Sequence, residues 1–68
     1  MAARVIVNGR EMSADLPSTL EAFLIAQDLP PRSVVVELNG EAVAASEIAT
    51  HELHPGDQLE VVRVVAGG

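Results

Sequence analysis

Two apolar segments of this chain each end in the dipeptide Asn-Gly, and this repeated pattern constrains the fold more than any other feature. Residues 4–7 (Arg-Val-Ile-Val) precede Asn8-Gly9, and residues 34–38 (Val-Val-Val-Glu-Leu) precede Asn39-Gly40. β-branched residues favour strands. Asn-Gly is the strongest short signal for a two-residue hairpin turn. The sequence therefore predicts two β-hairpins.

One helix is expected between these hairpins. Its inward positions are Leu20, Phe23 and Leu24, which follow the i, i+3, i+4 spacing of a helical face. Ser18 fits a capping box, in which its hydroxyl accepts from the amide of Glu21 and Glu21 reaches back. Gln27 takes the next inward position, where an apolar residue is expected. The following Pro30-Pro31 ends the helix, because the residue before a proline disfavours α geometry.

The remaining segments complete an α+β pattern. The return strands of the hairpins are expected at residues 10–14 and 41–43, and a turn of helix at 44–50. Pro55-Gly56-Asp57 signals a turn before a last, longest strand at 58–65. This order of elements predicts a mixed sheet of about five strands with one main helix packed on one face.

Alternation along the strands assigns each side chain to one face of the sheet. The helix-facing set, with Val43 and the inward helix residues, is expected to form the core: Val5, Val7, Val34, Val36, Leu38, Leu59 and Val61. The opposite face is expected to be apolar in the middle and charged at its edge, with residues Arg4, Ile6, Val35, Glu37, Glu60, Val62 and Val64. No second helix remains to cover this face.

An uncovered apolar patch with a polar rim is typical of a protein-docking surface. We therefore predict that partners dock on Ile6, Val35, Val62 and Val64. The alternative interpretation is that a small β domain simply exposes some valine side chains.

Length and charge limit the class of protein. A chain of 68 residues forms one domain. Its net charge of −6 and single aromatic residue argue against binding of nucleic acid and favour partners with basic surfaces. No apolar run is long enough for a membrane span, and the N-terminus lacks the pattern of a signal peptide. A cytoplasmic location is the default expectation.

The side chains predict neither an enzyme nor a metal or cofactor site. The chain has no cysteine, so thiol catalysis is excluded, and its serines lie near no recognisable base motif. His51 and His54 stand three residues apart, but the nearby Pro55-Gly56 favours a loop over a metal-binding helix. Solvent exposure explains Glu11, Glu41 and Glu47 better than acid–base chemistry does.

The C-terminal sequence contains the most informative chemistry. The valine-rich last strand leads into Ala66-Gly67-Gly68. We expect residues 1–65 to form the domain and residues 66–68 a flexible tail, since glycine adds backbone freedom and no bulk. Such a tail fits a channel too narrow for a Cβ atom. The reactive group would be the carboxylate of Gly68, which a nucleotide-using partner can activate.

The order of these elements resembles the ThiS family, the sulfur carriers of thiamin biosynthesis. The resemblance rests on residues 34–41 (Val-Val-Val-Glu-Leu-Asn-Gly-Glu), on Pro55-Gly56-Asp57 before the last strand, and on the Ala66-Gly67-Gly68 end. It covers nearly the whole chain. Two features depart from the family pattern: residues 44–48 replace a polar pair and an aromatic residue, and Gln27 replaces an apolar one.

The resemblance implies a β-grasp, ubiquitin-like fold and a carrier function. It implies that an E1-like adenylyltransferase (ThiF-like) uses ATP to adenylate Gly68, and that a sulfur donor system then converts the adenylate to a thiocarboxylate. The tail would deliver this sulfur to a thiazole synthase (ThiG-like). Two alternatives stay open: a MoaD-like carrier of molybdopterin synthesis, and a β-grasp interaction module without chemistry on its tail.

Overall fold

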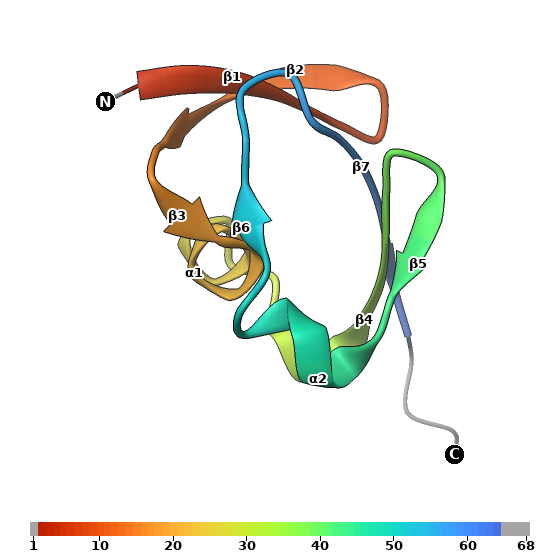
Figure 1. Cartoon of the computed structure of the whole chain (residues 1–68). Coiled ribbons are helices and arrows are strands. Elements are labelled where there is room, and N and C mark those ends of the chain that lie inside the picture. Colours follow the sequence, from red (N-terminus) through yellow and green to blue (C-terminus); the bar gives the residue numbers. More distant parts are fainter. Residues whose placement is uncertain (1, 65–68) are drawn as a thin grey trace.

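The computed structural model describes residues 2–64 as a mixed five-stranded sheet with one main helix against it (Figure 1). The strand order is β2-β1-β7-β4-β5, in which β1 and β7 are parallel and the other neighbours antiparallel. The predicted fold class is confirmed. The strands of this sheet are β1 (Ala2–Val7), β2 (Arg10–Asp15), β4 (Val34–Leu38), β5 (Glu41–Val43) and β7 (Gln58–Arg63).

Both predicted hairpins are confirmed. Asn8 and Asn39 have φ angles of 52° and 51°, and the glycines after them have 82° and 86°. Two successive residues with positive φ define the turn whose twist matches the flanking strands. The register follows: Val7 pairs with Arg10 in the first hairpin, and Leu38 with Glu41 in the second. The first return strand extends one residue further than expected, to Asp15.

The helix α1 (Leu20–Ala26) buries its three expected residues but is capped by a different side chain. The Thr19 hydroxyl accepts from the amide of Ala22 at 3.1 Å, so the predicted Ser18 capping box is wrong. Ser18 lies in the short strand β3 (Ser18–Thr19) and donates its hydroxyl to the Thr19 carbonyl. Pairing of Ser18 with Leu53 keeps it extended, which moves the helix start by one residue.

The interpretation of Gln27 as an inward helical position is also wrong. The helix ends at Ala26 and Gln27 is its C-cap, with φ −91° and ψ 8°. The Gln27 amide donates to the carbonyls of Phe23 and Leu24, and Asp28 adopts a positive φ of 61°. The backbone then turns back against the end of the helix, where the Leu29 amide donates to the Leu24 carbonyl at 2.8 Å.

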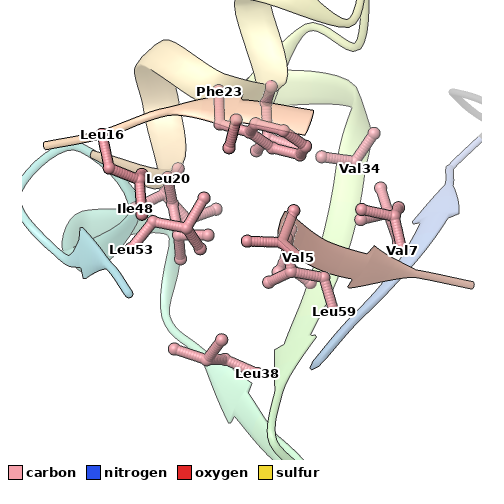
Figure 2. Close-up of a cluster of buried hydrophobic side chains, with 14 residues drawn as sticks. Val5, Val7, Leu16, Leu20, Phe23, Val34, Leu38, Ile48, Leu53 and Leu59 are labelled. Atoms are coloured by element: carbon pink, nitrogen blue, oxygen red, sulfur yellow. The ribbon is translucent and has the colours of Figure 1, made fainter. Parts of the chain in front are cut away.

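A second layer of short elements covers one end of the core, and the sequence pattern did not predict most of it. Strand β6 (Glu52–Leu53) pairs with β3, and α2 (Ala45–Ile48) is the expected turn of helix. A 3-10 turn, η1 (Pro31–Ser33), precedes β4. These segments add buried side chains beside Leu20, as Figure 2 shows for Leu16, Ile48 and Leu53.

The core otherwise follows the prediction. Every predicted core residue of the sheet and helix is buried except Val43, which is half-buried. Ala14, Leu16, Ile48 and Leu53 complete the core. The last strand ends at Arg63, whereas the expected end at Val65 lies outside the described residues, as does the predicted boundary between domain and tail. Within residues 2–64, no helix has the length and apolar character needed to cross a membrane.

Candidate partner-docking face

Three of the four residues predicted to dock partners lie on β1, β4 and β7, on the face of the sheet opposite α1, and the fourth, Val64, directly follows β7. Val35, Val62 and Val64 are 52%, 61% and 49% exposed, whereas Ile6 is half-buried. In the described part of the chain these three valines and Ile25 of α1 are the exposed large hydrophobic residues. We call this surface, formed by Val35, Val62, Val64 and Ile6 with the polar side chains between them, the open face.

Strand register divides the open face into rows. Val35 pairs directly with Val62, and the next row of this face pairs Glu37 with Glu60. Ile6 pairs with Gln58, one row further along β7. The expected arrangement, with an apolar centre and a charged edge, is therefore wrong, because an acidic row separates Ile6 from the two valines.

A hollow of about 460 Å³ lies elsewhere, between β2 and α1, but the open face has its own hollow of about 340 Å³. Its lining consists of Val35, Glu37, Gly40, Gln58, Glu60 and Val62. Gly40 contributes no side chain at one end, and its Cβ position meets no atom within 4 Å. The valine row forms the other end. This hollow combines an apolar wall with two carboxylates.

The acidic row lacks compensating cations in the described part of the chain. Arg4 pairs with Glu11 at 2.6 Å, and Arg63 donates to the carbonyl of Asp28 at 3.4 Å. Among residues 2–64, no hydrogen bond or ion pair to the side chain of Glu37 or Glu60 is present. Like charges on directly paired residues of neighbouring strands repel each other and destabilise the pairing. The open face therefore presents negative charge that a basic partner would neutralise.

The valine row lies at the end of β7 that leads to the C-terminus. Strand β4 pairs with β7 as far as Val34 and Arg63, and the Val64 amide donates to the Ser33 carbonyl at 2.7 Å. The predicted tail of Ala66, Gly67 and Gly68 lies outside the described residues. Along the chain, only a few residues separate Val62 from Gly68.

The two histidines do not form the helical pair that metal binding would require. They flank β6, and neither is helical. His54 Nδ1 lies 3.9 Å from Asp57 Oδ2, while the His51 carbonyl accepts from Leu20. No cluster of three or more potential metal ligands occurs between residues 2 and 64.

Comparison with known proteins identifies the family. The model of the ThiS family matches residues 5–68, which is almost the entire chain. The chain belongs to the ThiS family. The predicted resemblance is confirmed, and the fold of this ThiS-family protein is the ubiquitin-like β-grasp.

Solved structures agree with this assignment. A crystal structure of the thiamine biosynthesis protein ThiS from Geobacter metallireducens has a TM-score of 0.79 and 26% identity, and the match covers 96% of this chain and 99% of that one. A solution NMR structure of a thiamine biosynthesis protein from the same organism has a TM-score of 0.77 and 26% identity, over 96% and 87% of the two chains.

Two curated relatives of this ThiS-family protein are larger and have another name. A thiazole synthase of Paramagnetospirillum magneticum is 35% identical over 65 residues, and a thiazole synthase of Magnetococcus marinus is 32% identical over 65 residues. Each match covers 96% of this chain but only 20% of the relative. The chain therefore spans about a fifth of the length of these relatives.

Proposed function

We propose that this protein is a sulfur carrier of thiamin biosynthesis whose reactive group is the carboxyl of Gly68. An E1-like, ThiF-like enzyme uses ATP to adenylate this carboxyl, and sulfur from a donor system converts it to a thiocarboxylate. The thiocarboxylate then supplies sulfur for thiazole formation. The protein is a co-substrate of its partners, which supply the catalysis and bind the ATP.

The observation that carries this proposal is the extent of the family match. It continues past the last described strand through Gly68, so the Ala66-Gly67-Gly68 sequence belongs to the matched pattern. The structural likeness to the Geobacter thiamine biosynthesis proteins supports the same pathway. In the sequence, Val62 of the open face lies only a few residues before Gly68, which supports one partner that binds the face and receives the tail.

The chemistry follows from the state of the carboxyl group. At neutral pH the carboxylate is ionised and is a poor electrophile. Attack of a carboxylate oxygen on the α-phosphate of ATP releases pyrophosphate and leaves an acyl adenylate. A sulfur nucleophile then displaces AMP at the carbonyl carbon, so that a carbon–sulfur bond replaces the carbon–oxygen bond to phosphate. The chain contributes only the carboxyl and its presentation.

The partners follow from the comparisons and from charge. Proteins named thiazole synthase contain a region similar to 96% of this chain, which supports a thiazole synthase (ThiG-like) as recipient of the sulfur. The net charge of −6 and the acidic row favour basic surfaces on that synthase and on the adenylating enzyme, because complementary charge accelerates encounter.

Intact mass spectrometry tests the proposal. The protein is incubated with the E1-like enzyme, ATP and the sulfur donor system, and its C-terminal peptide should gain one oxygen-to-sulfur exchange. Gly67→Val is the matched variant: it leaves the carboxyl at the same sequence distance but adds bulk, and adenylation should fall sharply at unchanged Tm. Wild-type protein that is never adenylated would favour the interaction module without tail chemistry.

A further inference from the structure

The two asparagines of the Asn-Gly turns both contact β7, but Asn39 contacts its first residue, Gln58, whereas Asn8 contacts Leu59 and Val61 further along the strand. The backbone amide of Asn8 donates to the Leu59 carbonyl at 2.8 Å, and that of Asn39 to the Gln58 carbonyl at 2.7 Å. Each side-chain Oδ1 accepts a β7 amide: Val61 at 2.8 Å for Asn8, and Gln58 at 3.0 Å for Asn39. Each Nδ2 also donates one hydrogen bond.

The Asn8 contact takes the place of a missing strand residue. Strand β1 pairs with β7 at Ile6–Gln58 and Val7–Leu59, and then turns away at Asn8. Beyond this point the side-chain carboxamide of Asn8 bonds both backbone groups of Val61. Its Oδ1 accepts from the Val61 amide, and its Nδ2 donates to the Val61 carbonyl at 3.1 Å. The side chain thus extends the ladder by one residue pair toward the C-terminal end of β7.

We infer that Asn8 is a positioning residue that holds the C-terminal half of β7 in the orientation required for modification of Gly68. This inference rests on the proposed carrier function. Val61 directly precedes Val62 of the open face, and β4 with Ser33 holds the following residues from the other side. Asn8 supplies the β1-side contact with the backbone of Val61, which is closer to the C-terminus than Gln58 and Leu59, the residues of β7 that pair with β1.

Asn39 provides the matched control because its contacts lie at the start of β7. Its Nδ2 donates to Asp57 Oδ1 at 3.1 Å, and its Oδ1 accepts from the backbone amide of Gln58. Asn39 therefore holds the loop that precedes the strand. Both asparagines have φ near +50°. Glycine tolerates this conformation, so Asn8→Gly and Asn39→Gly each remove two side-chain hydrogen bonds without backbone strain.

Steady-state adenylation by the E1-like enzyme, with the carrier as varied substrate, separates positioning from stability. Both glycine variants should lower Tm, by about 5–15 °C. Asn8→Gly should lower kcat by about 10- to 100-fold with a smaller change in KM, because a carboxyl displaced by about 1 Å loses reactive geometry. Asn39→Gly should stay within about twofold of wild type at a temperature where both variants are folded.

Asn8→Asp tests the amide donor itself, since aspartate has the same shape and also tolerates positive φ. Its second oxygen faces the Val61 carbonyl in place of Nδ2, so it should behave like Asn8→Gly in kcat. Amide hydrogen exchange supplies a measurement without any partner: Val61 and Val64 should exchange faster in Asn8→Gly than in Asn39→Gly.

The outcomes test the positioning role of Asn8 and the proposed carrier function separately. Equal kcat for the two glycine variants, or equal exchange at Val61 and Val64, overturns the positioning role while wild-type adenylation keeps the carrier function. Wild-type protein that is not adenylated overturns the proposed function, and the positioning role with it.

Discussion

Replacement of Val62 by aspartate is the most direct test of the open face. Val62 is 61% exposed and pairs with Val35. Full burial of a valine side chain contributes about 1.5–3 kcal/mol, so covering the exposed three-fifths contributes about 1–2 kcal/mol to docking. A carboxylate loses this contribution and must also be desolvated beside Glu60. Binding should therefore weaken by about 2 kcal/mol or more, which is roughly 30-fold or more in Kd.

Ile25→Asp provides the control, because Ile25 is 60% exposed but lies on α1, on the other side of the sheet. Both variants should fold, and the cost of aspartate in a strand is limited to about 1 kcal/mol. Isothermal titration calorimetry with the E1-like enzyme measures Kd, and thermal unfolding verifies folding. A folded Val62→Asp protein that binds as tightly as wild type, or an Ile25→Asp protein that loses as much affinity, would refute the assignment.

Three further predictions address charge, tail and capping. Replacing both Glu37 and Glu60 by glutamine should raise Tm slightly by removing opposed charges, and should weaken partner binding and reduce its salt dependence; unchanged binding at low salt would contradict the acidic row as a recognition element. Deleting Gly68 withdraws the carboxyl by about 3.3–3.6 Å, so adenylation should be lost with Tm nearly unchanged, and normal adenylation would contradict the carrier mechanism. In urea unfolding, Thr19→Ala should cost about 1 kcal/mol through loss of the cap, whereas Ser18→Ala should cost clearly less; the reverse order would restore Ser18 as the cap.

Local chemistry predicted the parts of the fold that short-range rules determine. Asn8-Gly9 and Asn39-Gly40 fixed the hairpins, and alternation placed Val36 and Leu59 in the core. The elements of two residues, β3 and β6, have too few positions for any periodicity. Their pairing also decided between Ser18 and its neighbour as the helix cap, which no local rule distinguishes because both hydroxyls are acceptable caps.

The candidate site was predictable in composition but not in layout. Alternation placed Val35, Val62 and the two glutamates on one face, and the structure confirms this. Their order across the face depends on which residue of β4 meets which residue of β7, and the valine-rich pattern allows several registers. The contact of Asn8 with Val61 spans 53 positions in the sequence, so nothing near Asn8 indicated it.

The central place of β7 has a mechanical consequence. Strand β7 runs between β1 and β4 and joins the two hairpins, which share no direct strand pairing (Figure 1). A force applied to the chain beyond Val64 would act on this strand along its axis. Hydrogen bonds on both sides then resist in shear, all together rather than one after another. Pulling β7 out of the sheet would require its hydrogen bonds to β1 and β4 to break together. The carrier should therefore stay folded when a partner holds it by its C-terminus.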